Sequence, residues 1–464
     1  MRILRKLLII GVLCAFALPL AAQSNFILTV SPSNVQTVLT SHGLTIVREL
    51  YDGPNCVYLV SSASSDATSV ETEVEKDLLV AGFEPEQPAR LPELNGATQV
   101  NLNQSTSTVL ESLSGLTLVQ YFGSTVPSNY LAQSAASIIR LADAQNATHL
   151  TGAGTVAIID TGVDPNHIAL SGVLVPGYNF ADDNTNVSEF QDLSSTTIAN
   201  LQQSTSTVLE QSTSTVLEAQ NVVPMGPAIA AILDQSTSTV LEGNTPEDFG
   251  HGTMVAGIIH LVAPTAKIMP LRAFHTDGTS NLSNIIRAIY YAVNNGANVI
   301  SMSFSTQLPS PSLQAAVQYA LNKNVTVVAS AGNDGLKSLV YPASFGGVQG
   351  IGSTTSLDQK STFSNYGSGV TLFAAPGEAV ISTYPSGLYA AGWGTSFSAP
   401  MFAGGAALVL QEWPTAKPGD VTNALSKAKQ VSDMGYGRID LYLSLTNLVS
   451  GGSGTSGSGG SGKL

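Results

Sequence analysis

From about residue 128 onward the chain repeats one pattern, in which a short apolar segment is followed by a stretch with helical spacing. Apolar segments of strand length are typical of buried strands, and strands that alternate with helices form parallel sheets covered on both faces. The pattern therefore predicts an α/β fold with a mainly parallel sheet. Its expected strands are 156–159, 267–271, 299–302, 325–329 and 371–374, and its expected helices include 285–293 and 313–321.

The N-terminus has the pattern of a secretory signal peptide. Three cations, Arg2, Arg5 and Lys6, precede an apolar run over 7–20 that ends in small residues. We expect residues 1–22 to be removed after Ala22. An uncleaved N-terminal anchor is the alternative, but the run is short for a membrane span. The expected product is secreted from a bacterial cell, extracellular or periplasmic, with no stable membrane association after cleavage.

The composition excludes several classes of protein. There are 32 acidic against 18 basic residues, and the net charge of −14 would repel nucleic acid. Two cysteines cannot form a disulfide framework or a four-cysteine zinc site. The hydrophobic fraction of 43% supplies enough apolar material for a large core.

Composition and spacing divide the rest of the chain into parts. Residues 23–95 predict a small α+β unit in the order β-α-β-β-α-β, which matches a ferredoxin-like fold. Residues 96–127 are rich in Ser, Thr, Asn and Gly and predict a flexible junction. The large α/β unit is expected over 128–449. The Gly/Ser-rich tail 450–464 is a linker or an expression scar.

An octapeptide, Gln-Ser-Thr-Ser-Thr-Val-Leu-Glu, occurs four times, starting at Gln104, Gln203, Gln211 and Gln235. Its simplest interpretation is a duplicated low-complexity surface loop. Two alternatives remain open. The copies could pair as strands, because Thr and Val favour extended backbone, or they could mark self-cleavage sites.

Three segments carry residues suited to nucleophilic chemistry. Asp160 ends an apolar strand, where ligands bind in open α/β sheets. His251 lies between two glycines at the start of a helix, and Ser396 begins another helix, where backbone N–H groups stabilise negative charge. Taken singly, each has an ordinary structural interpretation, such as a helix cap for Asp160 or Ser396. Together they supply a nucleophile, a base and a residue that orients the base.

The chain order Asp, His, Ser occurs in subtilisins and differs from that of chymotrypsin-like enzymes and α/β-hydrolases. The segments Asp160-Thr161-Gly162, His251-Gly252-Thr253 and 394–400 (GTSFSAP) resemble those of the subtilisin-like serine protease family, the subtilases. The resemblance covers about 128–448 and implies the family's three-layer fold. It also implies that the α+β unit over 23–95 is an inhibitory propeptide.

The resemblance assigns further residues. Asn333, in the segment 329–335 (ASAGNDG), is implied to stabilise the oxyanion. Two edge segments are implied to bind an extended peptide between them, and a third segment is implied to form a pocket wall. These substrate-binding residues are Gly278, Thr279 and Ser280, then Ser303, Phe304 and Ser305, then Ser330, Ala331 and Gly332.

The chain departs from the family's pattern in three places that matter. Ser305 stands where the family usually has Gly, which is expected to narrow the pocket. Family members with the usual calcium loop have a longer stretch than this chain has between Ile259 and Pro264. Here only 260–263 lie in that stretch, so the calcium loop is expected to be absent. Calcium remains possible elsewhere, no cofactor is expected to be required, and the metal ligands stay unassigned. An insertion over about 182–247 separates Asp160 from His251 and is expected to loop out near the active site.

The expected function is that of a secreted serine endopeptidase, made as a self-processing zymogen. Its expected partners are protein or peptide substrates and its own propeptide, and it is expected to be a monomer. The alternative is a catalytically silent pseudoprotease that binds peptides or acts as a scaffold. An esterase of the α/β-hydrolase type does not fit, because Ser398 occupies the last glycine of the Gly-x-Ser-x-Gly motif.

Overall fold

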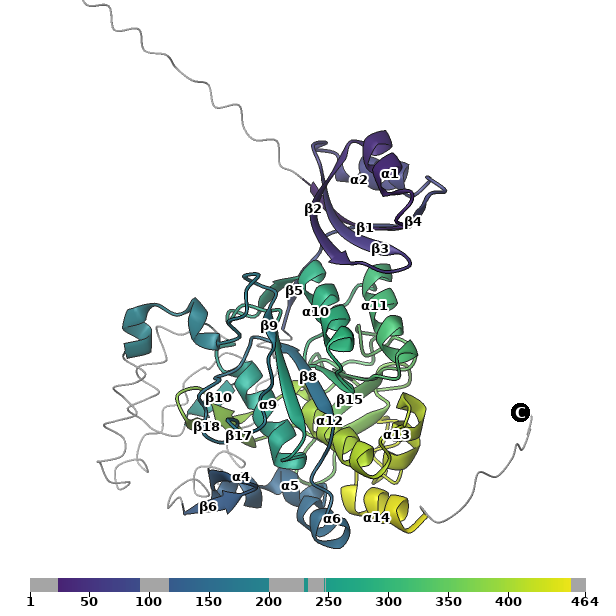
Figure 1. Ribbon diagram of the computed structural model, residues 1–464. Coiled ribbons are helices and arrows are strands. Elements are labelled where there is room, and N and C mark those ends of the chain that lie inside the picture. Colours follow the sequence, from purple (N-terminus) through teal and green to yellow (C-terminus); the bar gives the residue numbers. More distant parts are fainter. Residues whose placement is uncertain (1–23, 92–116, 200–228, 233–245, 247, 452–464) are drawn as a thin grey trace, which may run out of the picture. The chain divides into compact units, whose positions relative to one another are not determined.

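The computed structural model describes residues 24–91, 117–199, 229–232, 246 and 248–451 (Figure 1). The expected signal peptide, all four octapeptide copies and most of the C-terminal tail lie outside the described residues. The chain divides into two compact units, Met1–Glu86 and Gln87–Leu464. Among the helices of the described residues, none combines the length and apolar character needed to cross a membrane.

The first unit has one antiparallel sheet and two helices. Its strands are β1 (Ser24–Val30), β2 (Leu44–Tyr51), β3 (Cys56–Ser62) and β4 (Val80–Pro85), and its helices are α1 (Val35–His42) and α2 (Ala67–Val74). The strand order β2-β3-β1-β4 is that of the expected ferredoxin-like fold. Helix α2 ends at Val74. A turn at Asp77 accepts hydrogen bonds from Leu79 and Val80, and Leu78 is fully exposed.

The second unit is built on a seven-stranded sheet of order β16-β15-β14-β13-β8-β11-β9, in which every pair is parallel. The strands are β8 (Thr155–Asp160), β9 (Tyr178–Asn179), β11 (Lys267–Arg272), β13 (Val299–Met302), β14 (Thr326–Ser330), β15 (Gln349–Thr354) and β16 (Phe373–Pro376). The five predicted strands are all present. The sequence pattern missed β15, whose glycines hide its apolar character. A side chain on Gly350 would collide with the Val370 carbonyl, so this strand packs too closely for a larger residue.

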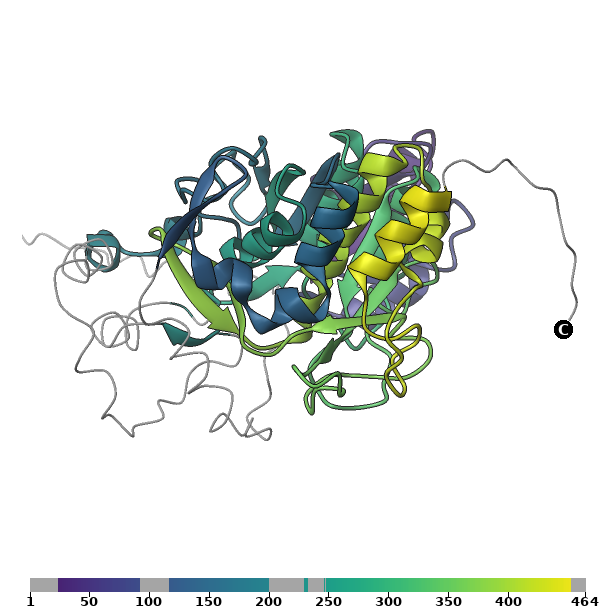
Figure 2. The same ribbon diagram turned by 90° about the horizontal axis from the view of Figure 1, so that it is seen from below.

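Helices cover the sheet in two layers. The long helices α9 (His251–Val262) and α12 (Thr395–Glu412) pack on each other, and α10 (Leu282–Asn294) packs on α11 (Pro311–Asn322). Helix α12 is buried on all sides through Leu410, as expected of a helix inside a large core. The remaining helices are α4 (Ser128–Ala132), α5 (Ser134–Ile138), α6 (Leu141–Thr148), α13 (Pro418–Leu425) and α14 (Leu441–Gly451). Figure 2 shows α6 beside α14.

Smaller sheets and one 3-10 helix complete the unit. They are the pair β6 (Leu118–Tyr121) and β7 (Ser124–Pro127), the pair β5 (Pro88–Arg90) and β12 (Thr279–Asn281), and the sheet of β10 (Ile229–Ile232), β18 (Leu388–Gly392) and β17 (Val380–Tyr384). The 3-10 helix η1 spans Glu189–Asp192.

The hairpin β6–β7 corrects the predicted flexible junction over 96–127 and the predicted start of the large unit at 128. The Tyr121 hydroxyl donates a hydrogen bond to the Leu261 carbonyl at 2.6 Å, and Val126 is completely buried. The hairpin therefore packs on the core of the second unit through Tyr121 and Val126, and the polar residues beside them conceal this burial in the sequence.

Candidate active site

The three residues singled out from the sequence lie at one edge of the parallel sheet. Asp160 is the last residue of β8, His251 is the first residue of α9, and Ser396 is the second residue of α12. The carboxyl ends of parallel strands meet at one edge, which is where α/β proteins bind their ligands. The exposed fractions of the three residues are only 1%, 1% and 2%.

Asp160 and His251 form a buried hydrogen-bonded pair. The distance from His251 Nδ1 to Asp160 Oδ1 is 2.7 Å. A carboxylate can only accept, so Nδ1 carries a proton, and in the neutral imidazole Nε2 keeps its lone pair. Gly252 allows the start of α9 to approach the residues after β8 this closely, because a Cβ on Gly252 would lie 2.0 Å from the Gly162 carbonyl oxygen.

The pKa of His251 is raised to about 9. Burial by itself lowers this pKa, because it penalises the charged imidazolium. The charge of Asp160 and the hydrogen bond to it outweigh burial, and Asp248 and Glu189 add to the same effect. The site thus stabilises a positive charge on His251.

Ser396 lies beside this pair but is hydrogen-bonded elsewhere. Its hydroxyl donates to the Ser303 carbonyl at 3.1 Å, and the Ser303 hydroxyl donates to the Ser396 carbonyl at 2.9 Å. Among the described contacts, no hydrogen bond joins Ser396 to His251. The next residue, Phe397, packs its ring 5.5 Å from the His251 ring, so the start of α12 adjoins the imidazole.

Asn333 is oriented by Thr395. Its Oδ1 accepts hydrogen bonds from the Thr395 backbone N–H and from the Thr395 hydroxyl, both at 2.9 Å. Because Thr395 holds Oδ1, the other end of the Asn333 amide, Nδ2, faces away from Thr395. A Cβ built on Gly394 would lie 3.4 Å from this Nδ2 and 3.7 Å from the Ser396 backbone nitrogen. Two N–H donors thus border the space left by the missing side chain of Gly394.

The expected substrate-binding residues lie on three elements. Gly278 precedes β12, which contains Thr279 and Ser280. Ser303, Phe304 and Ser305 follow β13, while Ser330 ends β14 and continues into Ala331 and Gly332. The last two segments run together, since the Ser330 hydroxyl donates to the Phe304 carbonyl at 3.4 Å.

The side chains at Phe304 and Ser305 point to different surroundings. Phe304 is 1% exposed and packs against Phe274, with ring centroids 5.2 Å apart. Its ring therefore belongs to the core. The Ser305 hydroxyl oxygen lies 3.5 Å from the point that a Cβ on Gly332 would occupy. Ser305 thus occupies space between the two segments.

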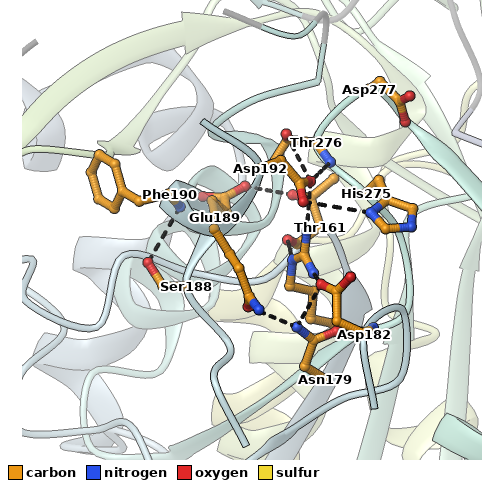
Figure 3. Close-up of polar contacts among 12 residues, drawn as sticks. Thr161, Asn179, Asp182, Ser188, Glu189, Phe190, Asp192, His275, Thr276 and Asp277 are labelled. Carbon is orange, nitrogen blue, oxygen red and sulfur yellow. Dashed lines mark hydrogen bonds and ion pairs between the residues drawn. The ribbon is translucent and has the colours of Figure 1, made fainter. Parts of the chain in front are cut away.

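Sequence reasoning missed Glu189. It lies in the predicted insertion, yet its side chain is completely buried and accepts hydrogen bonds from the residues around Asp160 and His251. Figure 3 shows its carboxylate directed toward Thr161. The part of the insertion over 182–199 is therefore built into the catalytic unit, which corrects the expectation that the whole segment loops out. No local signal could have revealed this, because its partners lie 28 to 64 residues away.

A charged network anchors the same segment. Arg272 is completely buried on β11, next to Asp160 in the register of β8, and its guanidinium pairs with Asp182 and Asp192. Burial raises the pKa of Asp192, but hydrogen bonds from His275 and Thr276 and the charge of Arg272 hold that pKa well below its usual range.

Asp182, Asp192 and His275 also form the one group of three metal-ligating side chains found within the described part of the chain, with ligand atoms within 4.8 Å of one another (Figure 3). Arg272 already supplies a positive charge to both carboxylates. The expectations about calcium therefore stay predictions.

A parallel α/β sheet that carries an aspartate, a histidine and a serine at its carboxyl edge defines the class of α/β serine hydrolases. Comparison with known proteins gives the particular family. The sequence model of the subtilase family matches residues 152–457. The chain belongs to the subtilase family, and it is a serine endopeptidase, as the resemblance implied.

Two relatives in sequence agree with this assignment. Subtilisin BL of Lederbergia lenta is 37% identical over 191 residues, which are 39% of this chain and 71% of the relative. Thermitase of Thermoactinomyces vulgaris is 32% identical over 303 residues, which are 62% of this chain and 86% of the relative. The crystal structure of a cold adapted subtilisin-like serine proteinase has a TM-score of 0.47 at 28% identity, covering 63% of this chain and 89% of that chain.

Proposed function

We propose that this endopeptidase is exported, is made as a self-processing zymogen, and cleaves peptide bonds with a triad of Asp160, His251 and Ser396. The observation that carries the proposal is the buried hydrogen bond from His251 to Asp160, with the first turn of α12 packed beside the imidazole. Export rests on the N-terminal pattern of cations, apolar run and small residues.

The proposed reaction begins with proton transfer. His251 Nε2 takes the proton of the Ser396 hydroxyl while Oγ attacks the scissile carbonyl carbon. To do so, the hydroxyl turns from the Ser303 carbonyl toward His251. Asp160 holds the tautomer and stabilises the imidazolium that forms. The tetrahedral intermediate then collapses, the leaving amine receives the proton from His251, and water hydrolyses the resulting acyl-enzyme.

The proposed oxyanion donors are the Asn333 side chain and the Ser396 backbone N–H. Both border the space beside Gly394, and Ser396 lies in the first turn of α12, where backbone N–H groups have no partner within the helix. Donors held in place before the reaction stabilise charge that develops only in the transition state. Thr395 supplies this preorganisation by binding Asn333 Oδ1.

Strand β5 supports two parts of the proposal, namely that a peptide substrate binds as an added strand and that the protein is made as a zymogen. Within the second unit, β5 pairs antiparallel with β12, and Arg90 lies opposite Thr279. The Leu91 backbone N–H donates to the Gly278 carbonyl at 3.0 Å, and the Leu282 N–H donates to the Gln87 carbonyl at 2.9 Å. A segment that precedes the catalytic residues thus adds a strand to the edge where a peptide substrate is expected to bind.

The packing of the hairpin β6–β7 limits where the proposed self-processing can occur. Removal of residues up to about 127 would strip Tyr121 and Val126 from the core, where their loss is costly. We therefore expect processing between residues 92 and 117, after β5 and before the hairpin. The unit that contains β1–β4 would then be the inhibitory propeptide.

Active-site labelling tests the proposed function. A fluorophosphonate probe reacts with an activated serine, so it should label the mature protein at Ser396 and block cleavage of a peptide library. The Ser396→Ala variant is the control and should stay unlabelled. A folded wild-type protein that neither reacts nor cleaves peptides would favour the silent pseudoprotease instead.

A further inference from the structure

Glu189 is a buried acid that the proposed reaction does not use. Its side chain is completely buried, and its carboxylate accepts hydrogen bonds from four donors. These are the Thr161 and Thr253 hydroxyls and the backbone N–H groups of Gly250 and Gly252, the last two at 3.1 and 3.2 Å. All four donors belong to the two loops that carry Asp160 and His251.

These contacts make Glu189 a bridge between the two loops. On one side, the Thr161 backbone N–H donates to Asp160 Oδ1 at 2.8 Å. On the other side, the donors Gly250, Gly252 and Thr253 surround His251 at the start of α9. One carboxylate therefore links the end of β8 to the beginning of α9, at the point where Asp160 and His251 meet.

The position of Glu189 is itself fixed. Arg272 pairs with Asp182 and Asp192, which lie before and after Glu189 in the chain, and its Nε donates to the Thr161 carbonyl at 3.1 Å. Buried hydrogen bonds to a charged group are stronger than neutral ones. The segment that carries Glu189 is thus tied on both sides to Arg272 of β11.

We propose that Glu189 is a positioning residue, whose carboxylate bridges the loops of Asp160 and His251 and holds the imidazole at the angle that proton transfer from Ser396 requires. This inference rests on the triad in the proposed function. Three hydrogen bonds join the loops without Glu189. One links Asp160 and His251, and the Gly252 N–H donates to the Thr161 hydroxyl at 3.0 Å. Farther along, the Asp164 N–H donates to the Thr253 hydroxyl at 2.8 Å.

The carboxylate form suits this role, because it offers acceptors only, and all four groups that face it are donors. Burial raises the pKa of Glu189 to about 7, and the neighbouring charge of Asp160 acts in the same direction. The hydroxyls of Thr161 and Thr253 and the charge of His251 oppose this rise, and Tyr384 is the other ionisable group that faces Glu189. The carboxylate form therefore prevails as the pH rises above about 7.

The test compares Glu189→Gln with Asp440→Asn, which removes another buried carboxylate at the start of α14. Fluorophosphonate titration counts active sites, so that kcat refers to folded enzyme only. For Glu189→Gln we expect kcat to fall about ten- to a hundredfold with KM nearly unchanged. The acid limb of kcat/KM should move to lower pH by up to about one unit, because a negative charge near His251 is lost. Asp440→Asn should keep both kcat and the acid limb.

A second pair of variants keeps the test decisive if Glu189→Gln does not fold. Thr253→Val removes one donor to Glu189, together with the acceptor of the Asp164 N–H, but leaves the Glu189 charge, so kcat should fall while the acid limb stays in place. Thr253→Ser keeps the hydroxyl and should restore kcat. An unchanged kcat per titrated site in Glu189→Gln, or in Thr253→Val where the Glu189 variant does not fold, would overturn the inference. A wild-type enzyme that the probe does not label would instead overturn the proposed triad.

Discussion

Ser396 and Ser303 are joined by two reciprocal hydrogen bonds, each hydroxyl donating to the carbonyl of the other residue. The proposed nucleophile is thus held by the segment after β13, one of the segments expected to bind substrate. Because the Ser396 hydroxyl points to a carbonyl rather than to His251, it must rotate before it can transfer its proton. Hydrogen bonds in catalytic sites often tighten only when substrate binds.

The first prediction concerns the triad itself. We expect Ser396→Ala and His251→Ala each to abolish peptide hydrolysis, because residues that act as a unit fail together. Asn333→Ala should be milder and leave measurable activity, with a loss of about 10²–10³ in kcat, since it removes one of two oxyanion donors. Steady-state kinetics on purified, folded variants measures this. Turnover by Ser396→Ala close to that of the wild type would refute the assignment.

The second prediction concerns pH. His251 must be neutral to accept a proton, so kcat/KM should rise with pH. Because neighbouring charges outweigh burial and raise the pKa of His251 to about 9, half of the plateau should be reached well above the ordinary histidine value of about 6.5. In Asp160→Asn the acid limb should move to lower pH while kcat falls, because the raising charge and the correct tautomer are both lost. A wild-type limb centred below pH 6.5 would contradict this role of His251.

The third prediction concerns maturation. In a host free of other proteases, the active chain should lose residues from 23 to a bond between 92 and 117, whereas Ser396→Ala should accumulate as the full precursor. The reason is that the proposed nucleophile also cuts the propeptide. Intact mass and N-terminal sequencing of both secreted products measure this. Identical maturation of the two chains would show that self-processing is wrong.

The fourth prediction concerns the pocket for the residue before the scissile bond. Ser305 fills space beside Gly332, so we expect a preference for Leu, Met or Ala over Trp, and poor cleavage after Asp or Glu. Ser305→Gly should raise kcat/KM for Phe and Tyr substrates by about tenfold. Ser305→Ala is the matched control, since it keeps Cβ and removes only the hydroxyl. A wild-type preference for aromatic residues with no gain in the Gly variant would exclude this role.

The fifth prediction concerns acid stability. His260 is buried in α9, and burial, helped by His167, lowers its pKa to about 4. The unfolded chain binds this proton near pH 6.5, so the contribution to the free energy of unfolding is complete above that pH. It is lost as the pH falls toward 4, by up to about 3 kcal/mol.

Urea unfolding of Ser396→Ala, which cannot digest itself, measures this contribution between pH 7 and 4. In this background His260→Leu should reduce the decrease in the free energy of unfolding between pH 7 and 4. His149→Asn, which replaces an exposed histidine, should leave that decrease unchanged. Equal pH slopes for all three proteins would contradict the prediction.

The elements that depend on local pattern could be predicted from the sequence. Apolar runs located five of the sheet strands, and the order Asp160, His251, Ser396 indicated the family before any geometry was known. Such features are readable because strand burial and helix periodicity are properties of neighbouring residues. The pattern failed where glycine or polar residues mask burial, as in β15 and in the hairpin β6–β7.

Only the tertiary structure decided what lies around those residues. Glu189 comes from a segment that looked like an insertion, and its partners Gly252 and Thr253 are more than 60 residues away. Phe304 and Ser305 are neighbours in sequence, yet one enters the core and the other faces Gly332. A parallel sheet brings the ends of distant strands to one edge, so the contacts of its site are long-range and no local pattern encodes them.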